Sequence, residues 1–278
     1  MTLGAPFGAR LAEAVRRRGP LCVGIDPHPS LLGAWGLGED VASLERFALT
    51  AVEALADQVA VLKPQAAFFE AYGSAGVAVL ERVVTEARQG GALVLLDVKR
   101  GDIGSTMTAY AKAYLDEHSP LAADAVTLSP YLGYGSLAPA IGLAEQTGRG
   151  VFVLARTSNP EGAGLQRAVT DGGGVAQSIV DAAAAGNAGA DPMGHIGLVV
   201  GATVRAGELD LSRLNGPILA PGLGAQGATV DGLRATFGPV LPQVLPATAR
   251  DVLRHGPGAA DLRKAARRVQ DQLTTLLD

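Results

Sequence analysis

The chain is short of cysteine, of aromatic residues and of long apolar runs, and each shortage excludes a class of protein. Its one cysteine, Cys22, rules out an intrachain disulfide framework and lies in an apolar stretch, where we expect it to pack as a small core residue. No apolar run approaches the roughly 18 residues that a membrane-spanning helix needs, and residues 1–18 lack the apolar centre of a secretory signal. These features predict a cytoplasmic protein without a membrane partner.

Dense positive charge is also missing. The formal net charge is −4, and the basic residues are scattered except for the run 16–18, which we expect to end a helix. A nucleic-acid-binding protein would instead gather basic residues on one face. The sequence therefore predicts no nucleic-acid partner.

What the chain does contain is enough apolar material for one large core. It has 278 residues, of which 48% are hydrophobic and only 4% aromatic, so the core is expected to consist of Ala, Val and Leu. Barrels of alternating strands and helices form single domains at about 250 residues. Because no linker or change in composition divides the sequence, we predict one domain over residues 1–278.

The order of the expected elements indicates the fold. Apolar runs typical of buried parallel strands alternate with helical patterns, beginning with a helix at 6–18 and ending with one at 259–277. Short helices are also expected before the seventh and eighth strands, and Pro242 leaves the limits of the last strand open. This pattern predicts a (β/α)₈ TIM barrel, with a doubly wound open sheet as the alternative. The eight expected strands are 21–25, 59–62, 92–96, 123–128, 151–155, 196–200, 217–220 and 240–245.

One glycine-rich segment, 159–174, is the longest irregular piece of the chain. Loops of this length are often functional lids or mobile segments. We therefore expect it near the functional site.

Polar residues follow the expected strands at the edge where the functional groups of a parallel barrel collect. Two of the chain's four lysines stand at such strand ends, and lysine can tune its pKa and donate a proton more readily than arginine. A bias in base composition could explain the many arginines, but it would not place these two lysines. The residues at strand ends are Asp26, Lys63, Asp97, Lys99, Asp102, Ser158, Gln226 and Arg250.

The first strands bring opposite charges together. Asp97 and Lys99 are two residues apart, so strand alternation predicts that they point the same way. With Asp26 and Lys63 they can form an array of alternating charge, in which lysines would compete with a metal ion. Such an array suits electrostatic catalysis with a lysine as proton donor, whereas a buried structural ion pair is the alternative.

The stretch Gly222–Gly227 matches the pattern G-x-G-x-x-G. It comes late in the chain and lacks the acidic residue that follows in dinucleotide-binding folds, so it is either a plain turn or a phosphate-binding loop. Its place after the seventh strand, with Arg250 after the eighth, favours a barrel phosphate site, where backbone N–H groups hold the oxygens and the arginine supplies charge.

Together these residues resemble a known family. The motif Asp97-x-Lys99-x-x-Asp102-Ile103-x-x-Thr106 is similar to the signature of orotidine 5′-phosphate decarboxylase. The segments 97–106, 129–133 and 156–160 resemble its longer bacterial subgroup, type 2, and the similarity covers about residues 22–250. The core motif alone is shared with related phosphosugar decarboxylases and synthases.

The resemblance implies roles for the residues that match. Asp26 and Lys63 would hold the ribose hydroxyls and complete the charge network, Asp97 would lie beside the substrate carboxylate, and Lys99 would protonate C6 of the pyrimidine. The residues after this strand would reach into the active site of the other subunit, which implies a homodimer with shared active sites. Those residues are Asp102, Ile103 and Thr106.

For the rest of the substrate, Ser158 resembles the residue that hydrogen-bonds the pyrimidine amide edge. Gln226, with Gly227 beside it, resembles the lid residue that bridges base and phosphate, and Arg250 resembles the phosphate-binding arginine. The family usually has glycine before that arginine, whereas Ala249 stands here.

The activity implied is the decarboxylation of orotidine 5′-monophosphate to uridine 5′-monophosphate, without a metal or an organic cofactor. Two other functions are compatible with a barrel of this kind. One is a metal-dependent phosphosugar decarboxylase or aldolase-type synthase, which would need a further acidic ligand near Asp97. The other is a non-catalytic barrel that binds a phosphorylated ligand.

Overall fold

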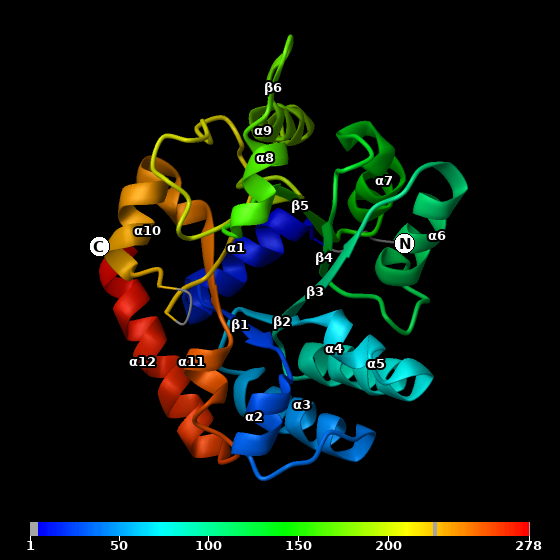
Figure 1. Ribbon diagram of the computed structural model, residues 1–278, viewed down its shortest axis with the longest axis vertical. Coiled ribbons are helices and arrows are strands. Elements are labelled where there is room, and N and C mark those ends of the chain that lie inside the picture. Colours follow the sequence, from blue (N-terminus) through cyan, green and yellow to red (C-terminus); the bar gives the residue numbers. More distant parts are fainter. Residues whose placement is uncertain (1–4, 225–226, 278) are drawn as a thin grey trace.

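The computed structural model describes residues 5–224 and 227–277, and strands within them close into a parallel barrel (Figure 1). The order around the barrel is β1-β10-β9-β8-β5-β4-β3-β2, so that the first strand pairs with the last. The prediction of a (β/α)₈ barrel is confirmed, and the open sheet is excluded. The barrel strands are β1 (Cys22–Ile25), β2 (Val61–Pro64), β3 (Leu93–Arg100), β4 (Ala125–Leu128), β5 (Gly150–Arg156), β8 (Ile196–Val200), β9 (Ile218–Pro221) and β10 (Val244–Thr248).

Helices surround these strands and complete the outer layer (Figure 1). Two of them begin at side-chain caps: Asp40 before α3 accepts a hydrogen bond from the backbone of Ser43 at 2.7 Å, and Thr229 before α10 accepts one from Gly232 at 3.1 Å. The principal helices are α1 (Phe7–Arg18), α3 (Val41–Leu55), α5 (Gly73–Gln89), α6 (Gly104–Leu115), α7 (Ala138–Gln146), α9 (Val175–Gly186), α10 (Val230–Phe237) and α12 (Ala259–Leu277).

The barrel interior is apolar and closed at one end by α1. Phe7 and Leu11 of this helix are buried in one cluster with Cys22, and Phe7 meets Phe152 edge to face at 6.1 Å between ring centroids. Burial raises the pKa of the Cys22 thiol to about 12, as fits a core residue. Because α1 blocks one mouth, a ligand can enter only from the opposite end, where the strands finish.

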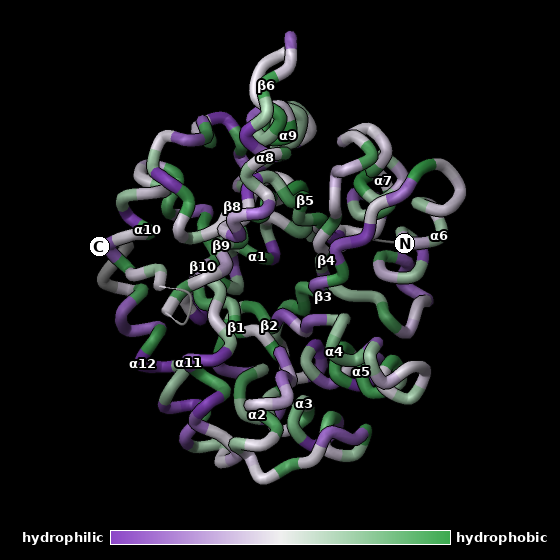
Figure 2. The backbone as a smooth tube through the Cα atoms, viewed as in Figure 1, coloured by the Kyte–Doolittle hydropathy of each residue, from purple (hydrophilic) through white to green (hydrophobic). Residues whose placement is uncertain are grey.

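Hydrophobicity follows this architecture. The strands near the axis are largely hydrophobic, whereas α12 on the outside carries many hydrophilic residues (Figure 2). The long helix nevertheless buries one side of each turn, through residues such as Leu262, Ala266 and Leu273. No helix in the described part of the chain has both the length and the apolar character needed to cross a bilayer.

Two expected elements differ in the structure. The prediction of a short helix before β9 is wrong. Residues 201–216 instead form separate turns, with hydrogen bonds such as Val204 N to Gly201 O at 3.0 Å. The eighth strand begins at Val244 rather than at 240, because Pro242 lies in the 3-10 helix η3 (Gly238–Gln243).

Short elements occupy places where no regular structure was expected. The segment 159–174 contains a 3-10 turn η2 (Pro160–Gly162), the helix α8 (Ala163–Gln166) and a projecting hairpin of β6 (Val169–Thr170) and β7 (Gly173–Gly174) (Figure 1). Further short elements follow strand ends around the barrel mouth. They are α2 (Pro29–Ala34), α4 (Ala66–Glu70), the 3-10 helix η1 (Tyr134–Leu137) and α11 (Arg250–Leu253).

Candidate active site

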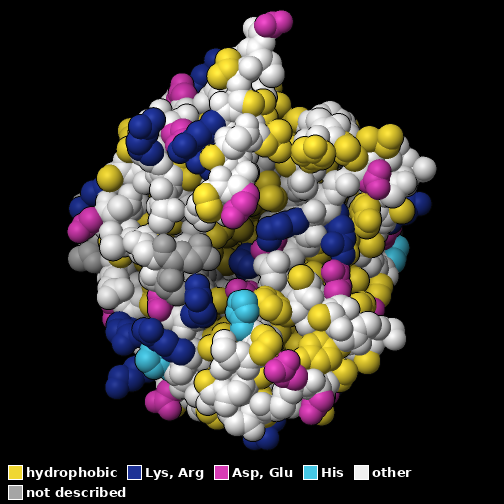
Figure 3. Space-filling view, viewed as in Figure 1, with side chains coloured by type: hydrophobic (Ala, Val, Ile, Leu, Met, Phe, Trp, Pro, Cys, Tyr) yellow, Lys and Arg dark blue, Asp and Glu magenta, His cyan; other side chains and the backbone are white. Residues whose placement is uncertain are grey.

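A cavity of about 320 Å³ opens at the strand ends, opposite α1. This size lies at the lower end of the range that holds small-molecule ligands. Lys and Arg side chains gather around the central hollow of this face (Figure 3). The lining includes Asp26, Lys63, Asp97, Lys99, Ser158 and Arg250, so six residues expected at strand ends surround one space.

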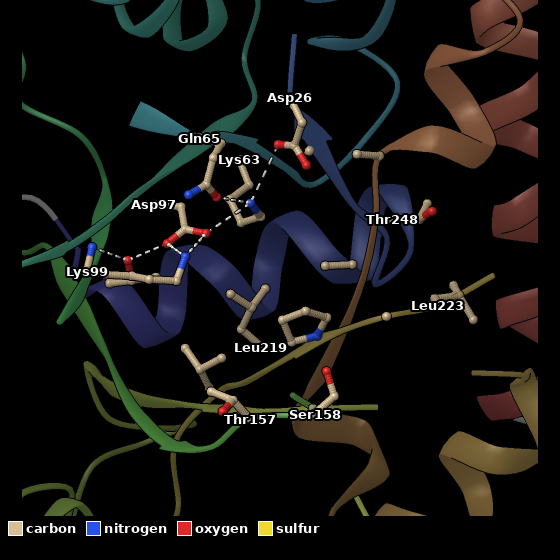
Figure 4. A pocket seen from close by; sticks show the side chains of 18 of the residues that line it. Asp26, Lys63, Gln65, Asp97, Lys99, Thr157, Ser158, Leu219, Leu223 and Thr248 are labelled. Carbon is tan, nitrogen blue, oxygen red and sulfur yellow. Dashed lines mark hydrogen bonds and ion pairs between the residues drawn. The ribbon is translucent and has the colours of Figure 1, made fainter. Parts of the chain in front are cut away.

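Four of these residues form a row of alternating charge (Figure 4). The Lys99 ammonium donates to both oxygens of Asp97, at 2.7 and 2.8 Å. On the other side, Lys63 Nζ lies 3.2 Å from Asp97 Oδ2 and 3.9 Å from Asp26 Oδ1. The two lysines and two aspartates therefore alternate along the floor of the cavity.

Burial and charge act against each other in this row. Burial alone would raise the pKa of Asp97, but Lys63 and Lys99 outweigh it and hold the pKa at about 2. Burial alone would lower the pKa of Lys63, but Asp26 and Asp97 outweigh it and raise the pKa above its ordinary value. Asp97 and Lys63 are therefore ionised throughout the neutral range.

The two lysines differ in their access to the cavity. The Lys63 side chain is 8% exposed, whereas that of Lys99 is 46% exposed. An ammonium group has three N–H donors, and Lys99 directs two of them to the carboxylate oxygens of Asp97. Lys99 is thus the more open of the two ammonium groups, whereas Lys63 lines the cavity between the two carboxylates.

Asp97 and Lys99 meet for a different reason than strand alternation. The pairing of β3 with β4 is irregular between Leu96 and Arg100, and Lys99 has φ +46°, an uncommon value for a residue other than glycine. A bulge in the strand therefore turns the Lys99 side chain back onto Asp97. The predicted contact is present, but the backbone that makes it is not a regular strand.

The loop after β9 and the start of α11 form the other end of the cavity. Gly222 and Gly224 have φ of +114° and +74°, which favour glycine. Gly222 and Arg250 line the cavity. Ala249, at the position where the family usually has glycine, has a negative φ of −123°, so the backbone there does not need the positive φ that favours glycine.

Two residues of the same loop were expected to bind substrate. Gln226 lies outside the described residues. Gly227 is described, with φ +90° and a backbone hydrogen bond from its N–H to Gly224 O at 2.7 Å, but it does not line the cavity.

The residues that follow β3 do not line this cavity. Asp102, Ile103 and Thr106 are not among its lining, and Ile103 is 61% exposed. Two more exposed apolar side chains, Tyr131 at 76% and Leu132 at 52%, come from the loop after the neighbouring strand β4. The rim beside β3 and β4 therefore presents apolar groups to the outside.

The loop that carries Ser158 is held by a polar network. Gln166 Oε1 of α8 accepts hydrogen bonds from the backbone of Thr157 at 3.0 Å and from Arg156 at 3.1 Å. Glu208 accepts one from Arg156 at 2.5 Å and two from Arg167, both at 2.9 Å. The segment 159–174 is thus tied to the strand end of β5 and to the turns that follow β8.

Sequence reasoning missed several polar residues of the lining, and three of them lie in or beside the charged row. Gln65 lies beside the charged row, with Oε1 3.4 Å from Lys63 Nζ, and His28 meets Phe68 edge to face with ring centroids 4.3 Å apart. Thr127, in β4, donates a hydrogen bond to Asp97 Oδ1 at 2.7 Å. His28 and Gln65 had a signal in the sequence, since each follows an expected strand by three residues. Thr127 had another, because it is the one hydroxyl residue in the apolar run 125–128.

Comparison with known proteins relates the sequence and the structure of this chain to one protein family. The sequence profile of the "Orotidine 5′-phosphate decarboxylase / HUMPS family" matches residues 19–264. The chain is 64% identical over 264 residues to the orotidine 5′-phosphate decarboxylase of Salinispora arenicola, covering 95% of each chain. It is 60% identical over 274 residues to that of Streptomyces coelicolor, covering 97% of this chain and 98% of the relative. The crystal structure of a candidate orotidine 5′-phosphate decarboxylase from Streptomyces avermitilis superposes with a TM-score of 0.96 at 57% identity, covering 99% of this chain and 96% of the other.

Proposed function

This chain belongs to the orotidine 5′-phosphate decarboxylase / HUMPS family, and we propose that it releases CO₂ from orotidine 5′-monophosphate to give uridine 5′-monophosphate, without a metal ion or an organic cofactor. A soluble nucleotide substrate supports the expected cytoplasmic location. The closure of one barrel by pairing of β1 with β10 supports a single domain over residues 1–278.

The observation that carries the proposal is the setting of Asp97. This carboxylate is buried, receives both ammonium groups and keeps its charge through a pKa of about 2. A substrate carboxylate placed beside it meets negative charge, whereas the carbon that loses CO₂ would lie near the open ammonium of Lys99. The site is therefore suited to stabilise negative charge that develops on carbon and to protonate it.

The steps follow from this arrangement. The C6–CO₂ bond breaks and leaves its electron pair on C6, where the Lys99 ammonium stabilises the carbanion before it transfers a proton to C6. Enzymes lower barriers by about 8–23 kcal/mol, which one charge does not supply. Binding of the remote phosphate by the loop at 222–224 and by Arg250 would organise the charged row around the base.

The same row supports binding of the ribose. Among the described residues, the buried Oδ1 atom of Asp26 has no hydrogen-bond partner, although Lys63 lies 3.9 Å from it. A buried acceptor of this kind is stabilised by a donor from a ligand. We assign Asp26 and Lys63 to the ribose hydroxyls, Ser158 to the pyrimidine amide edge, and Gln226 with Gly227 to the span between base and phosphate.

Metal-free chemistry is favoured by the neighbours of Asp97. A divalent cation bound to this carboxylate would lie beside the ammonium groups of Lys63 and Lys99, and like charges so close repel strongly. A metal-dependent relative would need a further acidic ligand in place of one of these lysines.

We also propose that the active protein is a homodimer with shared sites. Asp102, Ile103 and Thr106 lie outside the cavity of their own chain, while Ile103 and the apolar loop at 131–132 are exposed beside it. An interface over this rim would bury those apolar groups and bring the three residues to the partner's cavity.

Replacement of Lys99 tests the assignment of the proton donor. Lys99→Ala should still bind uridine 5′-monophosphate by calorimetry but should not convert orotidine 5′-monophosphate. Lys112→Ala, an exposed lysine on α6, is the matched control and should keep full activity. A fully active Lys99→Ala would contradict the assignment.

Mixing of two inactive variants tests the shared site. Lys99→Ala and Asp102→Ala, each inactive alone, should regain activity when mixed, because one site of the mixed dimer then receives both intact residues. Lys99→Ala mixed with Lys63→Ala should stay inactive, since both residues belong to the same chain's part of the site. Equal behaviour of the two mixtures would refute sharing.

A further inference from the structure

Thr127 makes three hydrogen bonds to the segment that carries the candidate catalytic residues. Its side chain is buried, at 1% exposure, at the end of β4. Oγ1 donates to Asp97 Oδ1 at 2.7 Å and accepts from the backbone N–H groups of Val98 at 3.0 Å and Lys99 at 2.9 Å. A hydroxyl has one donor and two acceptor positions, so all three are used on consecutive residues of β3.

These bonds replace part of the ladder between two strands. Leu96 pairs with Val126 and Arg100 pairs with Leu128, so that residues 97–99 on β3 face Thr127 alone on β4. The bulge removes the Val98 and Lys99 N–H groups from regular pairing. Without the hydroxyl, both donors would be left without this partner in a buried region, which is costly.

The bulge also sets the direction of Lys99. Its φ of +46° is uncommon for a residue with a Cβ atom and persists only where the surroundings enforce it. The hydrogen bond from Lys99 N–H to Thr127 fixes the backbone at this point, while the bond to Asp97 fixes the carboxylate that receives the Lys99 ammonium. One side chain therefore holds both ends of the Lys99–Asp97 contact.

From this geometry we propose that Thr127 is a positioning residue for the decarboxylation, which aims the Lys99 ammonium by holding the bulge and the Asp97 carboxylate together. The inference rests on the proposed function of the site. Thr127 acts through Asp97 and Lys99 and does not itself transfer the proton.

Thr127→Val, which replaces the hydroxyl with a methyl group of similar size, is the test. It should lower kcat by about 10- to 100-fold, the rate equivalent of one hydrogen bond to a charged group. Affinity for uridine 5′-monophosphate, measured by calorimetry, should change little, because the loop at 222–224 and Arg250 are untouched. Thr127→Ser keeps the hydroxyl and should retain most of kcat.

The matched control is Thr147→Val. Thr147 caps the end of α7, where its hydroxyl donates to Leu143 O at 2.8 Å, and it does not line the cavity. Its kcat should equal that of the wild type. If Thr127→Val does not fold, Thr127→Cys supplies the measurement, because a thiol is similar in size but a weak hydrogen-bonding group, and its kcat should fall below that of Thr127→Ser.

The outcomes separate this inference from the proposed function. An active wild type with an equally active Thr127→Val would overturn the positioning role. A Thr127→Ser variant as defective as Thr127→Val would overturn it too, since the hydroxyl would then not be the cause. A parallel loss of kcat and nucleotide affinity would show general damage to the cavity and refute a role specific to Lys99. A folded wild type that converts no substrate would overturn the proposed function and this inference with it.

Discussion

Replacing Lys63 with methionine should destabilise the protein more than any exposed lysine replacement. The Lys63 side chain is 8% exposed, and its ammonium lies between Asp97 at 3.2 Å and Asp26 at 3.9 Å. Methionine fills a similar volume but leaves two carboxylates without this cation. Removal of one partner from a buried ion pair costs about 3–5 kcal/mol, so the free energy of unfolding at neutral pH should fall by about that amount.

The pH dependence gives the prediction a second, independent component. Lys63 lowers the pKa of Asp97, whose folded value is about 2 against an ordinary 3.8, so the stability from this ionised carboxylate is present above pH 3.8 and is lost as the pH falls through about 2. In Lys63→Met the pKa of Asp97 is higher, and protonation relieves the uncompensated charge earlier. The difference in unfolding free energy between the wild type and the variant should therefore shrink as the pH falls from neutral toward 4.

Urea unfolding followed by circular dichroism at several pH values measures both components. Lys112→Met, at an exposed position on α6, is the control and should shift the unfolding free energy by less than about 0.5 kcal/mol. A Lys63→Met protein as stable as the control at neutral pH would refute the charge balance described here. A stability difference that stays constant with pH would refute the coupling to Asp97.

Two further replacements test the ends of the cavity. Arg250→Ala should weaken the binding of uridine 5′-monophosphate by about 10- to 100-fold, because a charge-assisted hydrogen bond to the phosphate is lost. The affinity for uridine, also measured by calorimetry, should not change. An equal loss of affinity for both ligands would contradict a phosphate contact. Glu208→Gln should raise the KM for orotidine 5′-monophosphate and lower the urea midpoint, because Arg156 and Arg167 lose their shared carboxylate. Glu161→Gln, at an exposed position in the segment 159–174, should change neither, and a silent Glu208→Gln would contradict a role in holding the Ser158 loop. Hydrogen bonds from Arg167 and Arg156 hold the pKa of Glu208 at about 2, so this effect should not vary between pH 5 and pH 9.

Much of the site could be predicted because of how parallel strands are arranged. All strands of such a barrel end at the same mouth, so charges that follow successive apolar runs must meet. The sequence therefore predicts Asp26, Lys63, Asp97 and Lys99 in one cavity, which all four line in the structure. The last helix, α12, has the predicted bounds 259–277, and the first, α1, begins one residue later than predicted and ends at residue 18 as predicted.

The predictions that failed concern segments whose structure depends on contacts between residues distant in the sequence. The alternation of residues along a strand cannot predict the bulge at Lys99, because the bulge depends on a hydrogen bond to the hydroxyl of Thr127 on another strand. Nor could periodicity show that residues 201–216 form turns, since Glu208 in that segment is held by Arg156 and Arg167 from elsewhere in the chain. Local pattern identifies apolar faces, whereas tertiary hydrogen bonds decide the irregular segments.

The short helices in the connections also could not be predicted from hydrophobic periodicity. The helices α2, α4 and α11 span six, five and four residues, too few for a periodicity of 3.6 to be recognised. The last strand was placed too early because the apolar run starting at 240 is continuous with it, although Pro242 belongs to the preceding 3-10 turn. The composition shows that these segments are apolar, but it does not show where one element ends and the next begins.

We propose that this cavity decarboxylates orotidine 5′-monophosphate by electrostatic catalysis without a metal ion. This is tested by mixing the purified protein with that nucleotide in excess EDTA and following the ultraviolet absorbance of the pyrimidine. We expect rapid conversion to uridine 5′-monophosphate at a rate that EDTA does not change. No conversion by the folded, dimeric protein, or conversion only after a divalent metal is restored, would contradict it.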